Sequence, residues 1–136
     1  MKLDGKKAGY LLLRLALGAV FLLYGVNKFR AGVGATIDQM GRQFDRTFLP
    51  SLAVKAFGGA LPSLEIVIGL LVLAGLFTRA ALVGAGLVLI ALSAGLAVLG
   101  NTATVATNLL FLLVVYVLLA HAEDNAFSLD AARKST

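Results

Sequence analysis

The sequence predicts an all-α protein: a transmembrane four-helix bundle with short amphipathic interfacial helices between its first and second spans. Three observations support this fold. The 136 residues are 60% hydrophobic and only 14% charged, whereas soluble domains carry about 25% charged residues. Mean hydropathy is +0.94. The run Ala80–Ala122 contains no Asp, Glu, Lys or Arg, which is enough chain for two crossings of about 20 residues each. We therefore expect one membrane domain over residues 1–136.

The first span is expected at residues 8–28. Lys residues precede its apolar run, as in a signal peptide, but Arg14 interrupts the run and Asn27–Lys28–Phe29 is a poor cleavage site. We therefore expect a retained helix. The later spans are expected at 62–78, starting at Pro62 because proline is tolerated in a first helical turn, and at 80–100 and 103–121.

The long connection between the first two spans has its own periodicity. Apolar residues recur three and four positions apart, which predicts a short amphipathic helix ended by Pro50. A second apolar piece, 52–57, leads to Gly58–Gly59. Both pieces are expected to lie on the membrane surface or to cap the bundle. The apolar positions of the first piece are Ile37, Met40, Phe44 and Phe48.

Charge and composition exclude several kinds of function. The net charge of +5 comes from basic residues at the two ends of the predicted spans, which suits lipid headgroups rather than nucleic acid. There is no cysteine, so thiol chemistry and Fe–S ligation are excluded. With one histidine, we expect no metal site. The positive-inside balance is nearly even and mildly favours both termini in the cytoplasm.

Charged side chains inside spans are costly and therefore informative. Arg14 and Glu65 are the two candidates, and counting residues from each end separates them by roughly 15 Å along the membrane normal. Two polar clusters are expected as a result. The loop-side cluster contains the candidate binding residues Glu65, Lys28, Asn27 and Asn108. The terminal-side cluster contains the anchor candidates Arg14, Arg79, Glu123 and Asp124.

Glu65 has two interpretations. It is a binding residue that accepts a proton or holds a polar head, or it forms a structural pair with Lys28. Arg14 is expected to anchor the first helix by pairing with Glu123 or Asp124. Small residues in the third span, including Gly84 and Gly95, predict close packing within the bundle or between copies of the chain.

The spacing of Arg14, Gly18, Phe21, Gly25 and Lys28 in the first span resembles the pattern of the DoxX family of small bacterial membrane proteins. The second span adds a match at Glu65, Gly69, Gly75 and Arg79, and the ending matches at Ser128, Leu129 and Asp130. Where the family commonly has glycines in this ending, the chain has Asn125 and Ala126–Phe127. The resemblance implies four membrane helices, a location in the bacterial inner membrane, and a link to quinone-dependent oxidation or to redox-stress complexes.

Three functions follow as expectations. The first is a membrane subunit of a quinone-linked oxidoreductase, with a quinone head near Glu65 and electrons supplied by a partner. The second is a membrane anchor or assembly protein for soluble partners, which would bind through the 30–61 connection. The third, a small transporter, fits less well because mid-bundle positions such as Val72 and Leu76 are apolar.

Overall fold

The computed structural model describes residues 4–134, and every regular element in that range is a helix. Four helices are long and apolar enough to cross a membrane, so the predicted all-α membrane fold is confirmed. They are α1 (Gly5–Ala31), α3 (Ser51–Ala74), α4 (Thr78–Val98) and α5 (Thr102–Ala120). The shorter elements are α2 (Val33–Gln43), the 3₁₀ turn η1 (Ala122–Asp124) and α6 (Leu129–Lys134).

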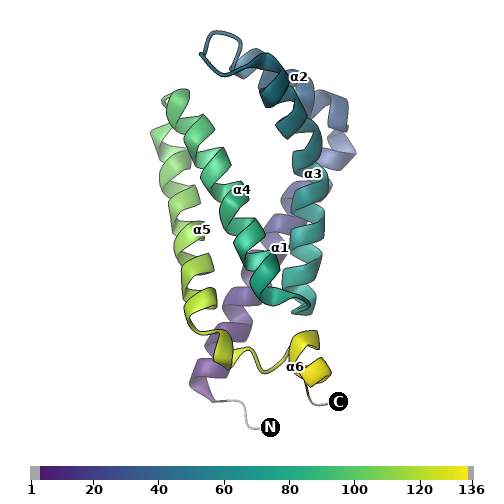
Figure 1. Ribbon diagram of the computed structural model, residues 1–136, viewed down its shortest axis with the longest axis vertical. Helices are drawn as coiled ribbons and strands as arrows, with labels where there is room; N and C mark the ends of the chain where they lie inside the picture. The colour runs from purple at the N-terminus through teal and green to yellow at the C-terminus, as the bar shows by residue number, and fades with distance from the viewer. Residues whose placement is uncertain (1–3, 135–136) are drawn as a thin grey trace.

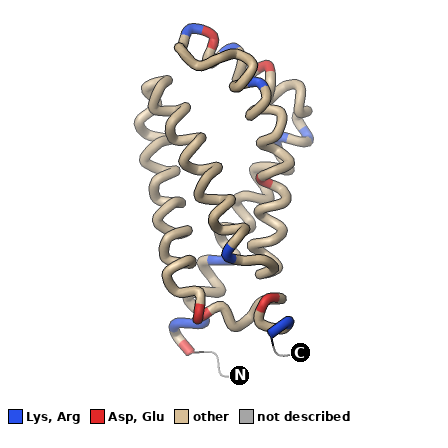
Figure 2. The backbone as a smooth tube through the Cα atoms, viewed as in Figure 1, with Lys and Arg blue, Asp and Glu red and all other residues tan. Residues whose placement is uncertain are grey.

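The long helices form two pairs, α1 with α3 and α4 with α5. Figure 1 shows that α3 and α4 meet at the short turn that joins them and diverge toward the other end of the bundle, where α2 lies. We call the end with the α3–α4 turn and both termini the terminal end, and the end with α2 the loop end. Charged residues gather at these two ends, with long uncharged stretches between them (Figure 2).

The α1–α3 pair is held by a glycine interface that brings two backbones together. A Cβ added at Gly69 would lie 2.5 Å from the backbone nitrogen of Leu22, and one at Gly25 would lie 2.8 Å from that of Ile66. Small residues allow this approach in lipid, where helix packing relies on van der Waals contact. The buried core continues from this interface toward α4 and α5 through Val72, Leu82 and Leu118.

Two predicted boundaries are wrong. The second span does not start at Pro62: α3 begins at Ser51 and continues through Pro62. The separate apolar piece 52–57 is therefore the first part of α3. The same helix ends at Ala74, where Gly75 takes a left-handed φ of 68° as the C-cap. Proline lowers helix stability but does not forbid a helix that tertiary packing supports, and Pro62 is buried against the bundle.

Candidate functional site

The loop-side polar cluster centres on an ion pair between α1 and α3. The ammonium of Lys28 donates a hydrogen bond to Oε1 of Glu65 over 2.5 Å. Glu65 is 2% exposed, whereas the side chain of Lys28 is one-third exposed. A carboxylate at this depth needs such a partner because burying an isolated charge is costly.

The second oxygen of Glu65 is the unusual feature. Within the described part of the chain, Oε2 is buried and has no hydrogen-bond partner. Buried polar atoms are nearly always hydrogen-bonded, so an exception calls for an explanation. Glu65 also lines a cavity of about 210 Å³, which we call the inner cavity. A ligand with a hydrogen-bond donor would satisfy Oε2.

The inner cavity places three further polar side chains near Glu65. Tyr24 comes from α1, and Thr104 and Asn108 come from the first turns of α5. Its other walls are apolar side chains of α1, α4 and α5. Asn27 lines neither this cavity nor the larger one, and it is exposed. Of the four predicted binding residues, the cavity therefore brings together Glu65, Lys28 and Asn108 and leaves Asn27 outside.

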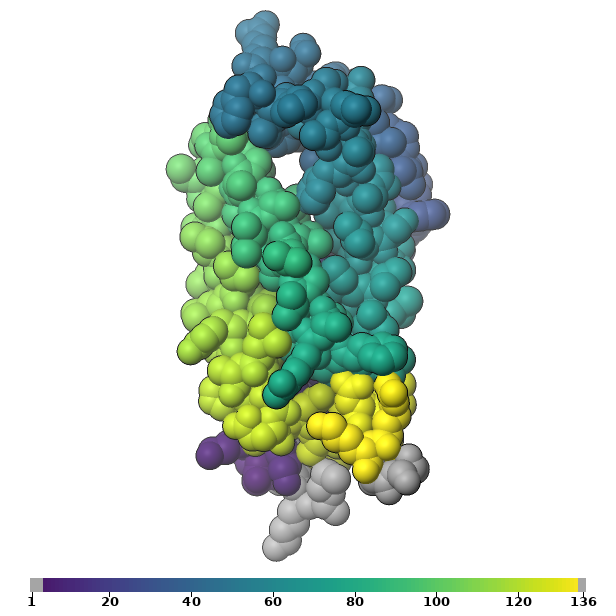
Figure 3. All heavy atoms as spheres, in the orientation of Figure 1, coloured from purple at the N-terminus to yellow at the C-terminus, as the bar shows by residue number. Residues whose placement is uncertain are grey.

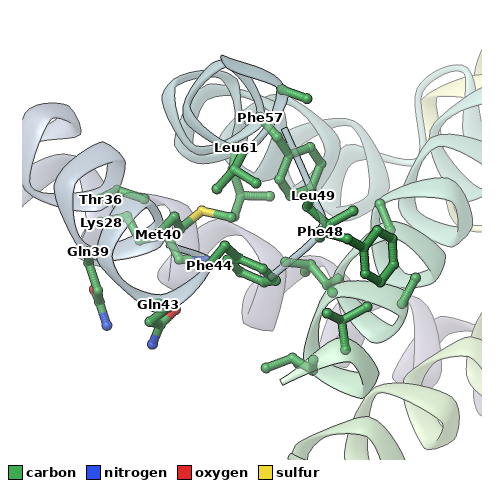
Figure 4. Close-up of a pocket in the computed structure, with 18 residues that line it drawn as sticks. Lys28, Thr36, Gln39, Met40, Gln43, Phe44, Phe48, Leu49, Phe57 and Leu61 are labelled. Carbon is green, nitrogen blue, oxygen red and sulfur yellow. The ribbon is translucent and has the colours of Figure 1, made fainter. Parts of the chain in front are cut away.

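A larger cavity of about 490 Å³ adjoins the inner one, and we call it the outer cavity. Its walls come from α2, from the α2–α3 connection, from the start of α3 and from the end of α4. Figure 4 shows Phe44, Phe48 and Phe57 around it, with Lys28 at one side. Both cavities are lined by Lys28, Leu92 and Leu96. The sequence indicated the helical periodicity of Phe44 and Phe48 but favoured packing at the membrane surface over a cavity wall.

The terminal-side cluster is separate. Arg14 is 3% exposed and donates hydrogen bonds to Oδ1 of Asn125 over 2.8 Å and to the carbonyl of Leu73 over 3.4 Å. Leu73 lies eight residues beyond Glu65 on α3, or ~12 Å along the helix, so Arg14 and Glu65 are apart, as the depth count predicts. The expected partners of Arg14, Glu123 and Asp124, lie in η1, and the guanidinium instead contacts the residue that follows them.

The C-terminal segment fastens the α3–α4 turn. Asp130 accepts hydrogen bonds from the backbone N–H groups of Phe77 and Thr78 and from the Thr78 hydroxyl, each at 2.7–2.8 Å. Burial opposes ionisation of Asp130, but these hydrogen bonds and the charge of Arg133 outweigh it, so the pKa of Asp130 lies below its ordinary value. Phe77 has a positive φ of 49°, a conformation that needs such support. Arg79, the remaining anchor candidate, is exposed on the first turn of α4.

No group of three or more potential metal ligands comes together among residues 4–134. The arrangement can therefore hold a polar group at the Lys28–Glu65 pair by hydrogen bonds and charge, with apolar space beside it. Apart from the pair, the inner cavity is lined by apolar side chains and by hydroxyl and amide groups.

Comparison with known proteins identifies the family. Residues 6–107 match the model of the family described as methylamine utilisation protein MauE. Neither a curated protein nor a solved structure matches the chain. The matched range includes Lys28, Glu65 and all of the outer cavity, whereas Asn108 and the C-terminal segment lie beyond it.

The match corrects the expected DoxX resemblance, because MauE is a different family. The glycines that carried that resemblance have a structural explanation: Gly18, Gly25 and Gly69 allow α1 and α3 to touch backbone to backbone. A close-packed pair of membrane helices needs small residues at this spacing in any family. The chain belongs to the MauE family and is a multi-pass membrane protein with four apolar helices.

Proposed function

We propose that this protein is an integral-membrane accessory protein of a redox system and that it binds the ring of an isoprenoid quinol or quinone at the Lys28–Glu65 pair. The observation that carries the proposal is the carboxylate of Glu65. One oxygen is held by Lys28, the other is buried and unpartnered among the described residues, and Glu65 lines the inner cavity.

The chemistry of the cavity suits this ligand. A quinol hydroxyl would donate a hydrogen bond to Oε2 of Glu65, and a ring oxygen would accept one from the amide of Asn108 or from the partly exposed Lys28 ammonium. The apolar remainder of the wall suits the faces of the ring. The chain has no cysteine, so the proposal assigns it ligand binding, and electrons are exchanged with a partner protein.

The family description adds a metabolic context. A methylamine utilisation protein belongs with the breakdown of an amine, which supports a redox system as the setting. The proposed location is the bacterial cytoplasmic membrane, with both termini in the cytoplasm. Reporter fusions at the C-terminus that are active only in the cytoplasm would test this orientation.

The direct test is the quinone content of the purified protein. We expect lipid extracts of wild-type protein in mild detergent to contain ubiquinone or menaquinone in near-stoichiometric amounts. Glu65→Gln keeps the shape but weakens the acceptor, and we expect at least about a tenfold loss of affinity, or about 1.4 kcal/mol.

Asn27→Ala is the matched control, because Asn27 lies one residue from Lys28 but is exposed and lines neither cavity. It should retain the quinone. Equal quinone content in wild type and Glu65→Gln would contradict the proposed role of Glu65.

A second candidate is an anchor or assembly protein for soluble partners. It is favoured by the α2–α3 connection, where Phe48 and the nearby Leu52 at the start of α3 are both 83% exposed at the loop end. If this function holds, Phe48→Ser with Leu52→Ser should release a co-purifying redox enzyme, whereas Glu65→Gln should leave it bound. The reverse pattern would favour the quinone site.

A further inference from the structure

We propose that the outer cavity is a binding site for a hydrocarbon chain and that its occupant is the isoprenoid tail of the molecule bound at Lys28–Glu65. The identity of the head rests on the proposed function. The hydrocarbon-chain site itself rests on the size and chemistry of the outer cavity and on the lining residues that it shares with the inner one.

The lining of the outer cavity offers contact surface and few hydrogen bonds. Phe44, Phe48, Phe57 and Leu61 surround it together with small residues of α4. Gln39 and Gln43 belong to the lining, but Figure 4 shows their amide groups extending away from the aromatic cluster. An apolar cavity of 490 Å³ is in the size range of ligand sites. Its walls match a flexible apolar chain and would leave a sugar or peptide without hydrogen-bond partners.

The neighbouring inner cavity suggests what one end of the bound molecule is. Lys28, Leu92 and Leu96 line both cavities, so a molecule that passes between these side chains would have a polar head on the Glu65 side and an apolar portion on the other. Lys28 marks the change from polar to apolar surroundings. A membrane amphiphile with a compact ring and a linear tail has this division, whereas a compact polar solute would leave the larger space unused.

The outer cavity also has a route to the bilayer. Figure 3 shows an opening between α4 and α3 below the α2–α3 connection. On the α4 side, the lining includes the small residues Ala91, Ala94 and Gly95, and both alanines are exposed. Small side chains keep this passage wide. Phe44 reaches α4 at the same place, since a Cβ on Gly95 would lie 3.1 Å from its ring.

The bilayer sets the energetics of the tail. Lipid is as apolar as the cavity, so the tail gains packing contacts rather than a hydrophobic transfer free energy when it enters. Affinity for the ring therefore comes mainly from the Lys28–Glu65 site, and the cavity must leave room for the tail. Filling the cavity should penalise tailed ligands by steric conflict and should leave tailless ligands unaffected.

The experiment fills the cavity from its two facing walls. Ala94→Phe acts from α4 and Ala53→Phe from α3, and both alanines line only the outer cavity. The matched controls are Ala97→Phe and Ala56→Phe, which make the same change one turn away at exposed positions that line neither cavity.

The chain has no tryptophan, so Phe111→Trp on the inner cavity wall provides a single fluorophore that a bound ring would quench. Binding is measured in nanodiscs with a tailless quinone and with the same ring carrying a long isoprenoid tail, each expressed per mole of lipid. We expect both filled variants to weaken the tailed ligand by about tenfold or more and to bind the tailless ligand as wild type does.

The outcomes separate the two proposals. If neither filled variant weakens the tailed ligand, or if both weaken tailed and tailless ligands equally, the chain site is refuted. If Glu65→Gln leaves the affinity for both ligands unchanged while the filled variants still weaken only the tailed ligand, the hydrocarbon-chain site is supported and the assignment of the ring to Glu65 is wrong. If the filled variants lose only co-purifying phospholipid, the occupant is an acyl chain and the isoprenoid assignment is wrong.

Discussion

Gly69→Ala tests whether the α1–α3 interface is as close as the structure indicates. The added Cβ would lie 2.5 Å from the Leu22 nitrogen, 2.8 Å from its Cα and 2.9 Å from the Gly18 carbonyl oxygen. All three atoms belong to backbone, so none can rotate aside and the helices must separate. Overpacking of this kind costs roughly 1–3 kcal/mol, and alanine returns up to about 1 kcal/mol of helix propensity. We expect a net loss of about 1–2 kcal/mol of unfolding free energy.

Gly84→Ala in α4 is the matched control. Its added Cβ would meet only the side chain of Ile68, at 3.6 Å, which is ordinary contact. This variant should be as stable as wild type or slightly more stable. Both are measured by reversible unfolding in mixed detergent–SDS micelles, followed by far-UV circular dichroism. A Gly69→Ala protein at least as stable as Gly84→Ala would refute the backbone-to-backbone packing.

Three further predictions concern the polar clusters. In a double-mutant cycle, Lys28→Met and Glu65→Gln should show a coupling of about 0.5–3 kcal/mol, and additive effects would contradict a direct pair. Hydrogen bonding holds the pKa of Asp130 in the folded protein below its ordinary value of about 3.9. The ionised carboxylate therefore stabilises the fold above pH ~3.9, and this contribution is lost as the pH falls through the lower pKa of the folded state. Asp130→Asn should therefore flatten the acid limb of a melting-temperature profile, and an unchanged limb would contradict this assignment. Arg14→Met and Asn125→Ala should each lower the melting temperature, because each removes the hydrogen bond that joins α1 to the C-terminal segment, and an unchanged melting temperature in both variants would contradict this contact.

The sequence predicted the number and order of the spans because hydropathy and length are local properties. It misplaced the start of α3 because Pro62 follows Gly58–Gly59 and resembles a helix-initiating signal. The structure resolves the conflict through packing: α2 covers this region, with Met40 close to Gly58 and Ile37 close to Gly59. A local helix-breaking signal is weak evidence where a neighbouring helix packs against the segment that carries it.

The candidate site was predicted in part, for physical reasons. Helical spacing and depth brought Lys28 and Glu65 to one level, and the structure pairs them. Spacing and depth could not exclude Asn27. Adjacent residues differ by about 100° around a helix, and which of them faces the cavity depends on how α1 is rotated against α3. The outer cavity could not be predicted from the sequence, because it depends on how far α3 diverges from α4.

The divergence of α3 from α4 depends on contacts at the terminal end of the molecule. At the terminal end, Arg14 and Asn125 join α1 to the C-terminal segment, while Asp130 holds the first turn of α4 and Asn125 donates to Thr78. The glycine interface fixes α1 on α3 along its length. The two helix pairs are therefore fastened at one end and can separate only toward the other, where the outer cavity and Lys28 lie. A fixed end suits a wide cavity beside a buried ion pair, since a uniformly packed bundle would close the cavity and a loose one would not hold its walls in place. The C-terminal contacts thus help to position the walls of the outer cavity, although the two lie at opposite ends of the bundle.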